Sequence, residues 1–152
     1  MASIPNDDID ILAKAKRALD RDYAPSDIDE YMSPQQLNYF RVLLLEWKKS
    51  ILSAAENTLQ LLQDGPIREP DLNDRASSET DWGIELRTRD RQRKLIAKID
   101  AALQRLDSGT YGYCEETGEP ISLKRLAARP IATLSVEAQE RHERRERVYR
   151  DD

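Results

Sequence analysis

Few side chains in this sequence are suited to chemistry. There is one cysteine, Cys114, and one histidine, His142. A single cysteine cannot form a disulfide within the chain, and a single histidine leaves little material for a histidine-based active site. No nucleophile–base pair, glycine-rich phosphate loop or cluster of metal ligands stands out from the spacing. The sequence therefore argues against an autonomous enzyme.

Charge is the second chemical feature, and it is concentrated in two neighbouring clusters. From Asp64 to Asp81 there are six acidic and two basic residues, a local net charge of −4. The stretch from Arg87 to Lys94 then holds five basic residues and one acidic residue. Acidic residues at a loop are either solvated charge or an interaction surface, and both readings stay open here. The net charge of −5 over 152 residues argues against non-specific binding to duplex nucleic acid.

The segment that leads to the acidic cluster begins with a strong helix signal. Ser33 is a good N-cap, and Pro34 suits the first helical position. Apolar residues then recur with 3-4 spacing, which indicates a coiled-coil seam: Leu37, Phe40, Leu44, Trp47, Ile51 and Ala54. The Asp64-Gly65-Pro66 sequence ends this helix.

A second helix is expected from about Ser78 to Leu106, because Ile96, Ile99, Leu103 and Leu106 repeat the seam spacing. Two long helices joined by a short connection must run antiparallel. The sequence therefore predicts an antiparallel coiled-coil hairpin over residues 34–108, with its tip at 65–78. Such a hairpin satisfies its own seam, so a monomer is expected.

The remaining segments predict a small base for the hairpin. Residues 4–20 read as a short amphipathic helix and 21–33 as a linker, so that 1–33 form part of the base. Residues 109–134 are rich in turns, and 135–152 read as a charged C-terminal helix. The expected fold class is all-α. The lone thiol, the acidic N-terminus and the lack of a long apolar stretch favour a cytoplasmic protein outside the membrane.

Three long segments resemble the DksA/TraR family of bacterial RNA polymerase-binding transcription factors. They are YMSPQQLNYFRVLLLEWKKSIL, DLNDRASSETDWGIELRTRDRQRKLIAKIDAAL and YGYCEETGEPISLKRLAARPIATL, and together they span about residues 31–138. The resemblance implies a helical hairpin on a globular zinc-finger-like base. It also implies that the hairpin enters the secondary channel of RNA polymerase and reads no DNA sequence.

In that family the protein shortens the lifetime of promoter complexes and acts with the alarmone ppGpp in the stringent response. It inhibits ribosomal RNA promoters and assists some biosynthetic promoters. The resemblance places the polymerase-active tip residues at Asp71, Asp74 and Ala76. Two carboxylates three residues apart at a helix start can share one face, and a small alanine permits close approach.

The resemblance also places the ppGpp contacts at Arg91, Leu95, Lys98 and Arg129. Guanidinium and ammonium groups suit phosphate oxygens. Gln139 stands where the family usually has lysine, which removes one cation. Arg141 is nearby, but on a different helical face.

Zinc is where the chain departs from the family pattern. Many members hold zinc with four cysteines, but here only Cys114 remains, while Thr117, Ser135 and Ala138 occupy the other positions. Structural zinc takes four ligands, usually cysteine or histidine. The sequence therefore predicts no tightly bound cofactor and no zinc. Without a second cysteine in the chain, Cys114 is expected to be an inert, partly buried thiol rather than a redox sensor.

Two other functions stay open. A transcript-cleavage factor of the Gre type uses the same hairpin geometry, with tip carboxylates that hold a magnesium ion in the polymerase active centre. A passive coiled-coil scaffold would be insensitive to charge changes at the tip. The DLNDRAS tip resembles the DksA pattern rather than the Gre pattern.

Overall fold

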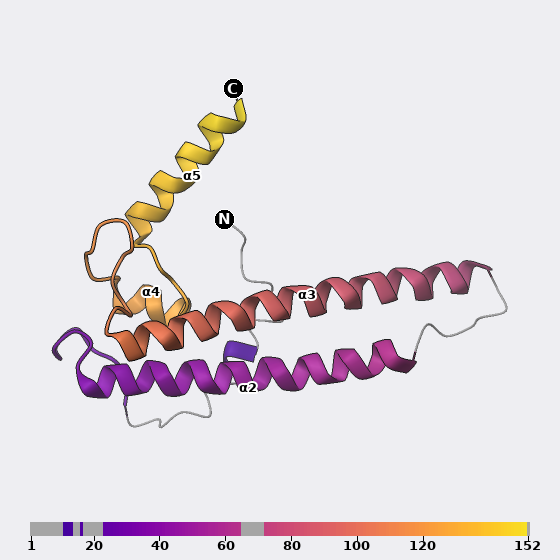
Figure 1. Cartoon of the computed structure of the whole chain (residues 1–152), viewed down its shortest axis with the longest axis horizontal. Coiled ribbons are helices and arrows are strands. Elements are labelled where there is room, and N and C mark those ends of the chain that lie inside the picture. Colours follow the sequence, from indigo (N-terminus) through magenta and orange to yellow (C-terminus); the bar gives the residue numbers. More distant parts are fainter. Residues whose placement is uncertain (1–10, 14–15, 17–22, 65–71, 152) are drawn as a thin grey trace.

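The computed structural model describes residues 11–13, 16, 23–64 and 72–151. Two long helices, α2 (Pro34–Asp64) and α3 (Leu72–Ser108), lie side by side and run antiparallel (Figure 1). At 1.5 Å per residue they are about 46 and 55 Å long. The short helix α4 (Leu123–Ala128) and the helix α5 (Val136–Asp151) lie at the end where α3 finishes. The predicted all-α coiled-coil hairpin on a small base is confirmed.

The N-terminus of α2 is capped by hydrogen bonds between side chains and backbone N–H groups. The backbone N–H of Gln36 donates to Ser33 Oγ, and the backbone N–H of Met32 donates to Gln36 Oε1 at 2.9 Å. This arrangement is close to a capping box, in which side chains satisfy the unpaired donors of a helix start. It explains why Gln36 is polar and yet fully buried.

The hairpin core forms where the two seams meet. On α2, Phe40, Leu44, Trp47 and Ile51 are fully buried, as the heptad spacing predicts. On α3 the buried residues are Gln92, Leu95, Ile99, Ala102 and Leu106. Ile96 and Leu103, which the sequence reading placed in the seam, are half-buried at its flank.

Two ion pairs, one heptad apart, join the helices. Arg41 Nη1 lies 2.8 Å from Asp107 Oδ1, and Lys48 Nζ lies 2.6 Å from Asp100 Oδ1. Both pairs are substantially exposed, so each contributes little to the free energy of folding. Their spacing is nevertheless consistent with a single antiparallel register along the hairpin.

The base is a small unit that follows the end of α3. An isolated antiparallel bridge joins Tyr113 to Pro120, and the backbone N–H of Ile121 donates to the Gly112 carbonyl at 2.7 Å. The Tyr31 hydroxyl donates to the Gly112 and Ile121 carbonyls, which ties the segment before α2 to this unit. Gly112 has φ +89°, a left-handed conformation that would strain any other residue, and a Cβ there would lie 2.7 Å from Met32 Cε.

The bounds of one helix differ from the sequence prediction, and another predicted helix lies mostly outside the described residues. The second hairpin helix begins at Leu72 rather than near Ser78, because the Asn, Asp and Ser residues read as a turn continue the helix. Most of the predicted helix over 4–20 lies outside the described residues, but residues 11–13 and 16 are helical and Leu12 is buried. Among the described residues, no helix is long and apolar enough to cross a membrane.

Candidate functional site

The end of α2 at Asp64 and the start of α3 at Leu72, which flank the predicted tip, lie far from the base (Figure 1). Asp71 falls outside the described residues. Asp74 and Ala76 belong to the first turns of α3, and the structure describes their backbone. The backbone therefore puts both positions at the free end of the hairpin.

The four residues predicted to contact ppGpp do not all meet. Lys98 and Arg129 line one pocket. Leu95 is only 8 % exposed and packs in the hairpin core, where it is unavailable to a ligand in the pocket. Arg91 lies further along α3 toward the tip and is not part of the pocket lining. The structure thus places two of the four residues predicted to contact ppGpp, Lys98 and Arg129, in one pocket.

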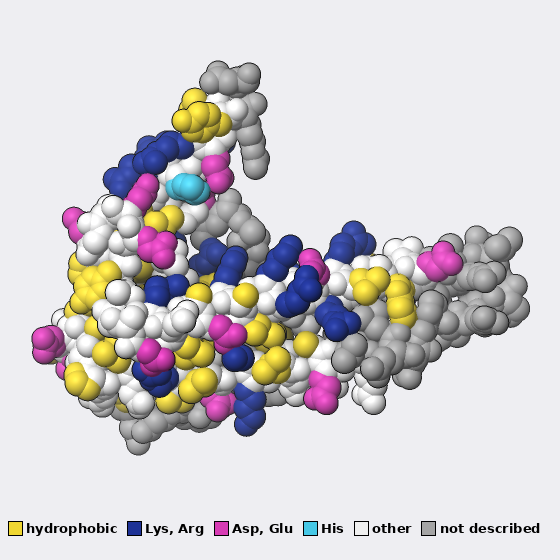
Figure 2. Space-filling model, in the orientation of Figure 1, with side chains coloured by type: hydrophobic (Ala, Val, Ile, Leu, Met, Phe, Trp, Pro, Cys, Tyr) yellow, Lys and Arg dark blue, Asp and Glu magenta, His cyan; other side chains and the backbone are white. Residues whose placement is uncertain are grey.

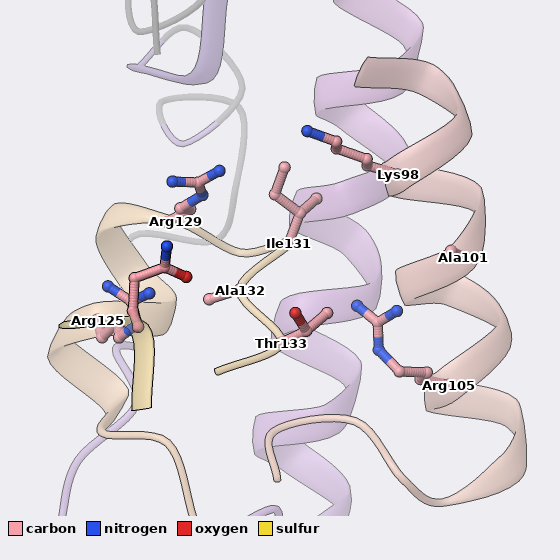
Figure 3. Close-up of a pocket in the computed structure, with 9 residues that line it drawn as sticks. Lys98, Ala101, Arg105, Arg125, Arg129, Ile131, Ala132 and Thr133 are labelled. Carbon is pink, nitrogen blue, oxygen red and sulfur yellow. The ribbon is translucent and has the colours of Figure 1, made fainter. Parts of the chain in front are cut away.

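The pocket lies between α3, α4 and the segment that leads into α5 (Figure 3). Its volume is about 290 Å³, near the lower end of the ~300–1,000 Å³ typical of ligand sites. The lining residues are Lys98, Ala101, Arg105, Arg125, Arg129, Ile131, Ala132, Thr133 and Gln139. In the close-up, the cationic side chains approach the pocket from α3 on one side and α4 on the other.

The charged side chains that line the pocket are all positive. Four cationic residues line it, and none of the lining residues in the described part of the chain is acidic. Burial, and then the charge of Arg125, lower the pKa of Arg129 from its ordinary value. Cations held this close in a partly buried site attract an anion strongly. Figure 2 shows dark blue side chains continuing along the face of α3 that looks toward α5.

Gln139 takes part in the pocket although it carries no charge. It lies in the first turn of α5, and its Nε2 donates to Glu143 Oε1 at 3.3 Å. Arg141 does not replace the missing cation, because its Nη2 faces Glu116 Oε2 at 4.0 Å and it does not line the pocket. Together with Arg145, which lies 3.3 Å from the same carboxylate, it links α5 to the turn after Cys114.

Cys114 lies in that turn with its sulfur enclosed by donors. The Thr117 hydroxyl and the backbone N–H groups of Ser135, Thr117 and Glu116 hydrogen-bond to it. Burial alone would raise the pKa of the Cys114 thiol, but these donors lower it from 9.0 to about 6. The structure thus brings three of the four family zinc positions together, and Ala138, the fourth, is buried in the first turn of α5.

The comparison with known protein families gives two adjoining matches. Residues 36–106 match the N-terminal domain of DnaK suppressor protein DksA. Residues 109–144 match the prokaryotic dksA/traR C4-type zinc finger. The chain belongs to the DksA/TraR family.

Individual DksA proteins agree with this assignment. The chain is 63% identical over 131 residues to the RNA polymerase-binding transcription factor DksA of Caulobacter vibrioides, covering 86% of this chain and 92% of that protein. It is 40% identical over 119 residues to DksA of Escherichia coli strain K12, covering 78% and 79%. The solved structure of transcription factor DksA2 from Pseudomonas aeruginosa superposes with a TM-score of 0.71 and 42% identity over 91% of this chain and 98% of that one.

The expectation that zinc is absent is corrected by these matches. Because residues 109–144 match a C4-type zinc finger of the DksA/TraR family, zinc binding is possible. The expectation rested on the loss of three of the four cysteines. It took no account of the fold of the zinc-finger-like unit, which keeps Cys114, Thr117 and Ser135 together. The donors fit the metal incompletely, since the described residues contain no group of three or more His, Cys, Asp or Glu able to hold an ion.

Sequence reasoning missed two of the cationic residues that line the pocket, Arg105 and Arg125. Arg105 follows Lys98 by seven residues, which puts both on one face of α3. Arg125 precedes Arg129 by four residues at the end of α4. The helical spacing from Lys98 and from Arg129 was therefore the signal that could have found them. The sequence could not show that these faces of α3 and α4 meet, because the fold sets that contact.

Proposed function

We propose that this protein regulates bacterial transcription by binding RNA polymerase directly and inserting its hairpin tip into the secondary channel. The observation that carries the proposal is the pairing of two features. The chain has a hairpin of two helices of about 46 and 55 Å standing on a small base. Its relatives of like length are named RNA polymerase-binding transcription factors.

The hairpin explains how such a protein would act at a distance. The shaft is occupied by its own seam, so the free end is the part available to reach into a channel. A carboxylate at Asp74 delivered there would hydrogen-bond basic or polar groups of the polymerase and change the stability of the promoter open complex. The expected outcome is inhibition of ribosomal RNA promoters and activation of some biosynthetic promoters.

The cationic pocket supports a role for ppGpp as co-effector. Lys98 and Arg129 line it, and phosphate oxygens are the natural partners of ammonium and guanidinium groups. The ligand would be held at the base while the tip acts in the channel. In this proposal the protein works in the cytoplasm as a monomer, without sequence-specific contacts to DNA.

The test is multi-round transcription from a ribosomal RNA promoter with purified bacterial polymerase, with and without ppGpp. Wild type is compared with Asp74→Asn and with Asp81→Asn, a matched control because Asp81 is an exposed carboxylate further along the same helix. The proposal expects inhibition by wild type and Asp81→Asn, loss of inhibition in Asp74→Asn, and a larger effect with ppGpp. Equal inhibition by all three proteins would refute the tip mechanism, and no inhibition at all would favour a passive scaffold.

A further inference from the structure

The buried core of the hairpin ends part-way along its length, at Ile51 on α2 and Gln92 on α3. Toward the base from these two residues, each helix buries a side chain in every turn. Toward the tip, none of the side chains that the structure describes at 52–57, 60 and 79–91 is buried. Burial of apolar surface is the main source of stability. The half of the hairpin near the base is therefore held together much more firmly than the half near the tip.

Gln92 ends the α3 seam with a polar group. It is only 4% exposed, and its Oε1 has no hydrogen-bond partner within the part of the chain that the structure describes. The register set by the two ion pairs between the helices puts Gln92 level with Ala54 and Ala55, which are small and half-buried. A buried amide oxygen without a donor is costly, and the cost disappears when water reaches it. Opening of the seam at this level is therefore favoured.

The tip side of Gln92 also holds a glycine in the interior of α3. A Cβ at Gly83 would lie 4.0 Å from Arg87 Nη2, an ordinary contact, so neither sterics nor a positive φ requires glycine there. Glycine inside a helix lowers the stability of that helix. Ile84 and Leu86 follow, and their side chains are 49% and 45% exposed. This stretch of α3 thus has a weak helix former and little apolar burial to offset it.

We propose that the hairpin consists of two cooperative units that meet at Gln92. The distal half (residues 52–60 and 79–91) opens on its own, while the proximal half (residues 36–51 and 92–106) and the base stay folded. Such opening redirects the helices that lead to the tip without moving the base. Its use inside a channel rests on the proposed function, but the opening itself is a property of the free protein.

The first experiment is backbone hydrogen exchange of the full-length protein, followed by NMR and corrected for intrinsic rates. Amides at 79–91 should exchange at least about tenfold faster than amides at 95–106, because local opening exposes them without global unfolding. Ile99→Val, which removes a methyl group from the proximal core, should speed exchange at 95–106 about three- to tenfold. Exchange at 79–91 should stay within about twofold of wild type, because Ile99 remains packed while the distal half opens.

Equal acceleration at 79–91 and at 95–106 in Ile99→Val would show that the hairpin opens as one unit, which would overturn the inference. That result would leave the proposed function in place, because the transcription assay with Asp74→Asn tests the tip whether or not the hairpin opens in two parts.

A second experiment tests the role of Gln92 itself. Gln92→Leu removes the unpaired amide and extends the apolar seam toward the tip, so exchange at 79–91 should slow about tenfold. The matched control is Gln104→Leu, the same change at an exposed position of α3, and it should leave these rates within about twofold of wild type. Equal effects of the two leucine variants, or faster exchange in Gln92→Leu, would contradict a boundary at Gln92.

A third variant tests the opening without altering the seam. Gly83→Ala raises the helix propensity of the distal half and should slow exchange at 79–91 about fivefold. Rates equal to those of wild type would show that α3 stays helical when these amides exchange, and this would overturn the proposed opening.

Discussion

The Tyr111 hydroxyl donates a hydrogen bond to the Pro130 carbonyl oxygen over 2.7 Å inside the base. Tyr111 follows the end of α3 and Pro130 follows α4, so this bond joins the hairpin to the segment that carries Arg129. Burial of the hydroxyl raises the pKa of Tyr111 far above its ordinary value, while the charge of Arg105 opposes this in part. The phenol therefore stays protonated and donates at every physiological pH.

Removing that hydroxyl should destabilise the base. Tyr111→Phe leaves the buried Pro130 carbonyl without its donor, and we expect a loss of about 1–3 kcal/mol in the free energy of unfolding by urea. Tyr113→Phe is the control, because Tyr113 is 39% exposed and packs edge-on against Tyr31. It should change stability by less than about 0.5 kcal/mol. Similar losses in both variants would contradict a specific role for the Tyr111–Pro130 bond.

Adjacent leucines on α2 should respond very differently to the same charge. Leu44 is fully buried in the seam, whereas Leu45 is 48% exposed. Leu44→Asp removes apolar contact and places a carboxylate in the hairpin core, so a loss of about 4 kcal/mol or more is expected. Leu45→Asp should stay within about 0.5 kcal/mol of wild type. Far-UV circular dichroism during urea unfolding measures both, and comparable losses would show that the register of the seam is different.

The Cys114 thiol should make stability depend on pH. Its pKa is about 6 in the folded protein and 9.0 ordinarily, so between these values the unfolded chain binds more protons than the folded one. Stability from this group is complete above pH 9, declines as pH falls and is lost below about 6.

We expect the stability difference between wild type and Cys114→Ser to grow from pH 6 to pH 9, measured by urea unfolding with a chelator present. The serine hydroxyl does not titrate in this range, so it is the matched reference. A difference that stays constant over this range would show that the donors around the sulfur do not favour the thiolate.

Transcript cleavage offers a sharp test between the two hairpin functions. With backtracked polymerase complexes, we expect this protein to release no more short 3′ fragments than polymerase alone, whereas a Gre factor run in parallel should release them rapidly. The reason is that the DLNDRAS tip sequence resembles the DksA pattern rather than the Gre pattern. Robust cleavage would reverse the choice of function.

Much of the hairpin could be predicted from residue types alone. Ser33 and Pro34 mark the start of α2, and the 3-4 spacing from Phe40 to Ile51 places the buried seam correctly. The α3 seam was less well predicted, because Leu95 and Ile96, and likewise Ala102 and Leu103, are adjacent apolar residues. Spacing allows either member of each pair, and packing against α2 selects Leu95 and Ala102.

The candidate site also has parts that the sequence predicted and parts that it did not. The tip at Asp71, Asp74 and Ala76 rests on the sequence resemblance and stays a prediction. The sequence-based ppGpp set mixed Lys98 and Arg129, which line the pocket, with Leu95, which the hairpin core holds. A match to a family position predicts where a residue lies along the chain, but it does not predict where the side chain points.

The two hairpin helices and their antiparallel pairing can be predicted from local periodicity and from caps that lie within a few residues of each other, and the family can be predicted from the resemblance of three long segments. The packing of the base brings Arg105 on α3 to face Arg125 and Arg129 across one pocket. The Tyr111–Pro130 hydrogen bond ties the end of α3 to the segment that follows α4. It joins residues 19 positions apart, and local sequence patterns carry no information about such a contact.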